Sequence, residues 1–223
     1  MKKLVLITFL TLLCVFAIVP AGVYAGEYGM RYKPGQGGYY DGCRATLTTP
    51  PSGYTVSATV KTIIQLKPDS NVQTGWQFYA GWSYPKSFYS YAVDHSPLGF
   101  LVEDFYLSDQ SWNFGRLYEL IHHSSLFSDC QWEIWIGNYK KATVIARTID
   151  GDSQPYQDET FYAGGKTSNS TDRHWARVNG FDLRYNGTSW AHNTSSSRYQ
   201  SGHFADPIDY NNYYNFLYQT TNW

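Results

Sequence analysis

The sequence predicts an all-β protein, a two-sheet antiparallel β-sandwich of the concanavalin-like jelly-roll kind. Two stretches, 55–66 and 72–80, alternate apolar and polar residues with the period of two that a half-buried strand requires. Other short strand-like stretches follow, separated by Gly, Pro, Asn and Asp, and none has a convincing helical period. Many short strands without helices favour two packed antiparallel sheets.

The stretch 72–80 is the most informative of these strands. Its alternation places Gln73, Gly75 and Gln77 on one face, and Trp76 with other bulky residues on the opposite face. We expect the apolar face to enter the core and the glycine-opened amide face to meet a ligand. The other expected strands are 43–49, 55–66, 87–93, 99–107, 116–123, 131–136, 143–149, 159–166 and 181–185.

The start of the chain predicts export. Residues 1–25 combine Lys2 and Lys3, an apolar stretch and small residues before Gly26, as a secretory signal peptide does. Removing 25 residues from 223 leaves 198, which suits one domain. We therefore expect an extracellular, membrane-free monomer. Residues 26–42 would form an extended lead-in, and residues 43–223 one sandwich domain with a polar tail from about residue 191.

The composition of the chain limits the classes of partner that it could bind. Without Lys2 and Lys3 the chain has 15 basic and 18 acidic residues, a net charge of −3. The longest basic run is then Lys140-Lys141, so no nucleic-acid surface is predicted. The chain is rich in Tyr and Trp, which is typical of β-sandwiches that bind sugars or peptides. A peptide or polysaccharide ligand is the expected partner.

The cysteines and histidines carry fewer predictions. Cys43 and Cys130 form an even pair in an oxidising compartment, which predicts a disulfide between them. The histidines are isolated or, as His122-His123, point to opposite faces of a strand. We therefore predict neither a metal nor another cofactor.

Four short blocks resemble the secreted sandwiches related to neprosin and to the fungal glutamic peptidases, the eqolisins. They are GCRATLTTP at 42–50, VQTGWQF at 72–78, FYAGGKT at 161–167 and VNGFDLRYNG at 178–187. The resemblance implies a catalytic glutamine at Gln73, which would donate to an oxyanion beside a carboxylate general base. It does not by itself carry activity over to this chain.

The family pattern can be aligned with this sequence in two ways, and each gives a different residue at the position of the carboxylate that pairs with Gln73. If the double glycine sets the alignment, the position often held by Glu is Lys166, and the protein is a non-catalytic relative. If the strand start sets it, Glu159 is the base. The two lie seven positions apart, so strand parity allows only one of them to face Gln73. Glu133 is a third candidate, which the alternation of its strand instead places in solvent.

Two functions follow from these alternatives. The first is an acid-acting endopeptidase with Gln73 and Glu159 as its catalytic pair. The second is a non-catalytic module that binds carbohydrate or peptide on the same face, with Lys166 as a charged donor. In both, the substrate-binding residues are expected to be Trp76, Gln77, Tyr89, Tyr91 and Lys166. A merely structural role is a third possibility.

Overall fold

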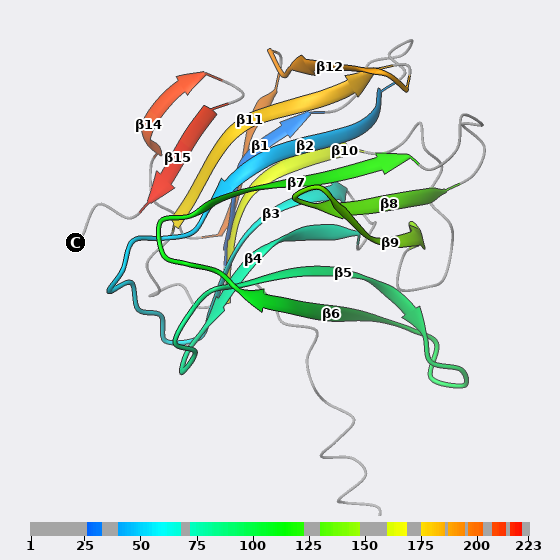
Figure 1. Cartoon of the computed structure of the whole chain (residues 1–223), viewed down its shortest axis with the longest axis horizontal. Coiled ribbons are helices and arrows are strands. Elements are labelled where there is room, and N and C mark those ends of the chain that lie inside the picture. Colours follow the sequence, from blue (N-terminus) through cyan, green and yellow to red (C-terminus); the bar gives the residue numbers. More distant parts are fainter. Residues whose placement is uncertain are drawn as a thin grey trace, which may run out of the picture.

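The fold was analysed in a computed structural model (Figure 1). The structure describes residues 26–32, 40–67, 72–122, 130–147, 160–168, 175–185, 187–194, 196–202, 207–212 and 215–219. In these ranges every regular element is a β-strand, and neighbouring strands pair antiparallel in two sheets. The predicted two-sheet antiparallel sandwich is therefore confirmed. No helix among the described residues is long and apolar enough to cross a membrane.

The first sheet has seven strands and carries the stretch 72–80 near its middle. Across the sheet the order is β13 (Ser197–Gly202), β1 (Gly26–Tyr32), β10 (Thr160–Thr167), β3 (Thr59–Lys67), β4 (Gln73–Tyr79), β5 (Lys86–Asp94) and β6 (Phe100–Asp109).

The second sheet has eight strands and packs against the inner face of the first. Its order is β14 (Pro207–Asn212), β15 (Asn215–Gln219), β11 (Trp175–Tyr185), β2 (Tyr40–Thr48), β7 (Gly115–His122), β8 (Gln131–Ile136) and β9 (Tyr139–Ile145), with β12 (Ser189–His192) paired to β11.

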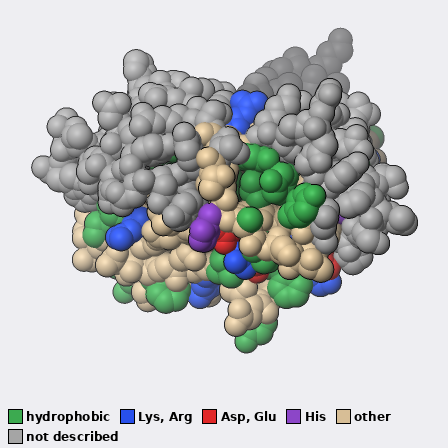
Figure 2. Space-filling view, turned by 90° about the horizontal axis from the view of Figure 1, so that it is seen from above, with side chains coloured by type: hydrophobic (Ala, Val, Ile, Leu, Met, Phe, Trp, Pro, Cys, Tyr) green, Lys and Arg blue, Asp and Glu red, His purple; other side chains and the backbone are tan. Residues whose placement is uncertain are grey.

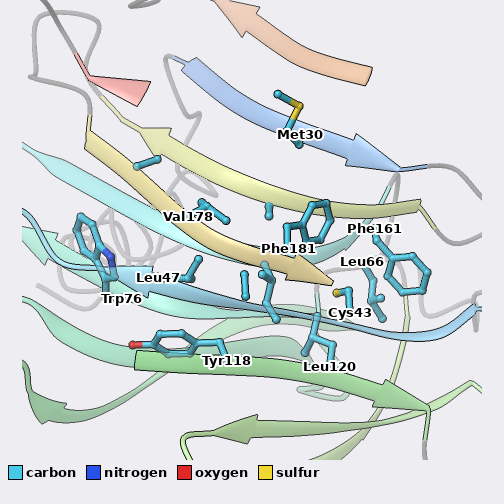
Figure 3. Packing of buried hydrophobic residues seen from close by; sticks show 14 of the residues in the cluster. Met30, Cys43, Leu47, Leu66, Trp76, Tyr118, Leu120, Phe161, Val178 and Phe181 are labelled. Atoms are coloured by element: carbon cyan, nitrogen blue, oxygen red, sulfur yellow. The ribbon is translucent and has the colours of Figure 1, made fainter. Parts of the chain in front are cut away.

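The core lies between the two sheets (Figure 3). Trp76 of β4 meets Leu47 and Val178 of the other sheet in one buried cluster. The indole nitrogens of Trp76 and Trp175 both donate to the Thr48 carbonyl oxygen, at 3.1 and 3.2 Å. Because each sheet supplies one of these indoles, the polar ends of two buried tryptophans are satisfied without water.

The beginning of the described chain corrects one expectation. Residues 26–32 do not form an irregular lead-in but strand β1, which pairs with β10 on one side and β13 on the other. Its glycines hid it, because Gly29 lies opposite Gly164, where an added Cβ would meet the Ala163 carbonyl oxygen at 2.2 Å. The pairing needs glycine, so an alternating apolar pattern could not mark this strand. The predicted signal peptide lies outside the described residues.

The predicted disulfide is also corrected. No disulfide joins Cys43 and Cys130, both of which the structure describes. Cys43 lies opposite Leu120 of β7, which in turn lies opposite Ile134 of β8, and Cys130 immediately precedes β8. Two strand spacings, roughly 9.6 Å, therefore separate the cysteine-bearing segments. A disulfide needs Cα atoms within about 7 Å.

Candidate functional site

The seven-stranded sheet has an inner face toward the core and an outer face that carries the amides. On β4, Trp76 points inward and is fully buried, whereas Gln73, Gly75 and Gln77 point outward. The register gives each outward residue a partner on β3: Gln65 opposite Gln73, Ile63 opposite Gly75, and Lys61 opposite Gln77. The predicted division of this strand into a core face and an amide face agrees with the register.

The same register brings Lys166 to this outer face. Lys166 of β10 lies directly opposite Lys61 of β3, which lies opposite Gln77 of β4. Two lysines and a glutamine thus form one row across three strands. We call the set of Lys61, Gln65, Gln73, Gln77 and Lys166 the amide face; all five residues are buried.

Lys166 is held by Glu27 of β1. Its Nζ lies 2.7 Å from Glu27 Oε1, and the two side chains are 6% and 15% exposed. Glu27 lies directly opposite Lys166 in the β1–β10 pairing, so the strand register itself creates this ion pair. The other predicted partner of Gln73, Glu159, lies outside the described residues.

Lys61 is held by Asp104 of the edge strand β6. Its Nζ lies 2.7 Å from Asp104 Oδ2, although β4 and β5 separate β3 from β6. The ammonium passes 4.6 Å from the centroid of the Phe88 ring on β5. Burial lowers the pKa of the Lys61 ammonium below its ordinary value, against the opposing effect of Asp104.

Glycine at position 75 allows the close packing of β3 and β4 beneath this bridge. A Cβ at Gly75 would lie 2.0 Å from the Thr62 carbonyl oxygen and 2.8 Å from Ile63 Cα. Beside it, Ile63, Phe88 and Tyr162 form a small buried apolar cluster of their own. The outer face therefore combines buried apolar groups with buried charges.

The two outward glutamines each retain an acceptor atom without a donor. Gln73 Nε2 donates to Ser90 Oγ at 2.7 Å. The Oε1 atoms of Gln73 and Gln77 are buried, and no hydrogen bond reaches either of them. A buried acceptor left unsatisfied costs on the order of 1–3 kcal/mol, so a donor that reached either oxygen after a side-chain movement would bind favourably.

Three predicted binding residues lie elsewhere. Trp76 is in the core, and Tyr89 lies opposite Thr74, so Tyr89 and Tyr91 lie on the inner side of β5. There they stack on Phe105 of β6, with ring centroids 5.1 and 5.0 Å away. The structure therefore removes these three rings from the face of Gln73 and leaves Gln77 and Lys166 on it.

Sequence reasoning missed Glu27, Asp104 and the role of Lys61. A signal for Lys61 was present, because the alternation of 55–66 places it on the polar side of its strand. Pairing 55–66 with 72–80 as an antiparallel hairpin, with both polar faces on the same side, would have placed Lys61 near Gln77. Glu27 and Asp104 have no local signal, since their contacts depend on strand order and sheet curvature.

A pocket elsewhere in the sandwich does not involve these residues. It has a volume of about 460 Å³ and opens between β6 and the turn that joins β8 to β9. Its lining residues are Leu107, Ser108, Arg116, Ile136, Gly137, Asn138, Tyr139 and Lys141. Nor does any group of three or more His, Cys, Asp or Glu that could hold a metal ion occur in the described ranges.

Comparison with known proteins identifies the fold. No family model and no curated protein matches the chain. Among solved structures it is similar to a crystal structure of scytalido-glutamic peptidase with a transition state analog inhibitor, with a TM-score of 0.59 and 12% identity over 87% of this chain and 97% of that chain. The chain has a glutamic-peptidase-like fold.

A second structure of that peptidase, with a peptide based transition state analog, gives the same picture. Its TM-score is 0.51 at 13% identity, over 87% of this chain and 98% of that chain. At this identity the likeness concerns the fold, and activity has to be argued from the residues of the amide face.

Proposed function

We propose that this protein binds an extended polymer on its amide face and does not hydrolyse it. The observation that carries this proposal is the pair of buried, donor-free oxygens, Gln73 Oε1 and Gln77 Oε1. They project from the same side of one strand, four residues and about 13 Å apart. A chain molecule lying along β4 would present N–H or O–H donors at intervals to both, in the extracellular space that residues 1–25 predict.

The lysines complete the recognition surface. Lys166 and Lys61 lie in the same row on one side of Gln77, and each is paired with one carboxylate, so these three residues and their partners supply donors and acceptors without a net charge. Such a surface suits a ligand rich in hydroxyl or amide groups better than a polyanion.

The neighbours of Gln73 argue against hydrolysis. Its direct cross-strand neighbours on the outer face are Gln65 and Ser90, and neither can serve as a carboxylate base. Glu27 and Asp104, the carboxylates that contact the lysines of the amide face, are each paired with one of those lysines. With Lys166 on the face of Gln73, the alignment that breaks the catalytic pair is favoured.

Binding can be tested by cosedimentation with insoluble polymers. The panel would include cellulose, chitin, xylan and crosslinked casein, and wild type would be compared with a Gln73→Ala/Gln77→Ala double variant. Gln131→Ala, on the eight-stranded sheet, is the matched control. We expect the wild type and the control to be retained and the double variant to lose at least tenfold in affinity. Equal retention of all three, or retention of none, would contradict the proposal.

A peptidase is the second candidate, favoured by Gln73 on the outer face of the seven-stranded sheet in a glutamic-peptidase-like sandwich. Its test is cleavage of casein between about pH 2 and 6, which brackets the titration of a carboxyl group. Activity that is lost in both Gln73→Ala and Glu159→Gln would establish this candidate and displace the binding proposal. Intact casein across the range would leave binding as the function.

A further inference from the structure

Three exposed or half-exposed aromatic rings contact one another beside the amide face: Tyr79 at the end of β4, Trp82 in the turn after it and Tyr106 on β6. Tyr79 is 48% exposed and Tyr106 44% exposed, and Trp82 lies between them. The Trp82 ring centroid is 6.0 Å from that of Tyr79 and 5.2 Å from that of Tyr106. We call these three residues the aromatic arc.

The strand geometry places one ring of the arc, Tyr79, in line with the glutamines. Tyr79 follows Gln77 by two positions on β4, so it points to the same side about 7 Å further along. Tyr106 lies opposite the outward-pointing Phe88, and Trp82 closes the turn after β4 through its N–H bond to the Tyr79 carbonyl oxygen. Tyr79 is therefore the ring of the arc that follows Gln77 along β4, and Trp82 links it to Tyr106.

Charged groups around the arc cancel in pairs. Lys86 Nζ lies 5.0 Å from the Trp82 ring centroid and 3.5 Å from Asp109 Oδ1. The Tyr106 hydroxyl donates to Asp104 Oδ2 at 3.1 Å, and Asp104 is the partner of Lys61. Each ammonium thus has one carboxylate, and the local surface has hydrogen-bonding capacity but no net charge.

We propose that the aromatic arc is a binding subsite for the pyranose rings of a neutral polysaccharide, whose next residues reach Gln77. This inference rests on the proposed function and names its ligand class. A pyranose has an apolar C–H face that stacks on an aromatic ring and a rim of hydroxyls that both donate and accept. The arc supplies the rings, and Gln77 Oε1 supplies a buried acceptor for a hydroxyl. The charge balance favours uncharged sugars over uronic acids.

Calorimetric titration with hexasaccharides tests the proposal. Cellohexaose, xylohexaose, laminarihexaose and chitohexaose are the neutral probes, and hexagalacturonate and a proline-rich hexapeptide are the competitors. We expect at least one neutral probe to bind wild type, and Tyr79→Ala, Trp82→Ala and Tyr106→Ala each to weaken it about fivefold or more. Tyr106→Phe separates ring stacking from the hydroxyl contact and should retain most of the affinity.

Tyr139→Ala is the matched control, because Tyr139 is 71% exposed on β9 of the other sheet and should not affect binding. Circular dichroism verifies that each variant is folded. If only hexagalacturonate or only the peptide binds, or if arc variants bind as wild type does, the inference is overturned. If one of these outcomes is found but the Gln73→Ala/Gln77→Ala variant still loses binding to a polymer, the proposed function stands and only the sugar subsite is wrong. Loss in the arc variants but not in the glutamine variant would overturn the proposed function instead.

Discussion

The outer faces of the two sheets both carry rows of charged side chains, but they differ in burial and in the number of hydrogen-bond acceptors that lack a donor. On the eight-stranded sheet, Arg44 Nε donates to Asp182 at 3.0 Å, and the other Asp182 oxygen lies 2.6 Å from His192 Nδ1. The guanidinium lies 4.4 Å from the Trp190 ring centroid. We call Arg44, Asp182, Trp190 and His192 the arginine row.

The arginine row is more open to water than the amide face, since the side chains of Arg44 and His192 are 30% and 61% exposed around an Asp182 side chain that is 9% exposed. Figure 2, viewed from the side of β11 and β12, shows histidine, acidic and basic side chains close together on this surface. The amide face is the opposite case, with Lys61 only 3% exposed and two glutamine oxygens unsatisfied. A charged row whose members satisfy one another in water is structural, whereas a buried row with acceptors left over is suited to a ligand.

The largest expected difference concerns close strand packing. Gly75→Ala would place a Cβ 2.0 Å from the Thr62 carbonyl oxygen, and backbone cannot yield cheaply. We expect a loss of about 4 kcal/mol or more in the free energy of unfolding, or failure to fold. Gly115→Ala on the eight-stranded sheet meets only Thr46 and Thr48 side chains, at 3.1 and 3.4 Å, and should cost about 1 kcal/mol or less. Urea titrations measure both, and similar losses would show that the packing is not special to the amide face.

The next difference concerns the ion pairs. Asp104→Asn leaves the buried Lys61 ammonium without its carboxylate and should cost about 3 kcal/mol. Lys61→Met/Asp104→Leu removes both charges and should recover most of that loss. Arg44→Met on the arginine row should cost only about 1 kcal/mol, because water replaces the lost contacts. If Arg44→Met proved as costly as Asp104→Asn, the distinction between the two faces by burial would be wrong.

The two faces should also respond oppositely to pH. The pKa of Lys61 is lowered by burial, so between that pKa and 10.5 the unfolded chain holds a proton that the folded chain lacks, and stability rises with pH. The pKa of Glu119, which lies 4.0 Å from Arg44, is raised by burial. Its stabilising contribution is complete below pH 4.5 and is lost as pH rises through the folded pKa.

Unfolding free energies of Lys61→Met and Glu119→Gln, each subtracted from wild type across pH 4 to 10, isolate these contributions from those of other groups. The Lys61 difference should have a positive slope on the alkaline side, and the Glu119 difference a negative slope on the acid side. Slopes of the same sign in both would refute the assignment.

The smallest effect is expected at an exposed pair. Lys140 Nζ lies 2.9 Å from Glu133 Oε1, but the lysine side chain is 43% exposed. Lys140→Ala should change the unfolding free energy by no more than about 0.5 kcal/mol, since water screens the pair. A change above about 1.5 kcal/mol in thermal or urea unfolding would mean that side-chain exposure does not predict how much these ion pairs contribute to the free energy of unfolding.

Local periodicity predicted much of the fold and part of the site. Gln73, Gln77 and Trp76 were assigned to their correct faces because alternation is fixed within one strand. The faces of Tyr89 and Tyr91 could not be known, because they depend on Gln73 lying opposite Ser90 rather than one residue away. Likewise, Asp104 reaches Lys61 from 43 positions along the chain, through sheet curvature that no local pattern encodes.

The central claim, that a polymer binds at the oxygens of Gln73 and Gln77 and leaves intact, is tested most directly by NMR of the glutamine side-chain amides. The ¹⁵N-labelled protein would be titrated with soluble oligomers of the polymer that it retains, with resonances assigned from the Gln73→Ala, Gln77→Ala and Gln131→Ala variants. The account predicts saturable shifts of the Gln73 and Gln77 amides, none at Gln131, and oligomers of unchanged mass afterwards. Unmoved Gln73 and Gln77 resonances at saturation, or oligomers cut by the wild type, would contradict it.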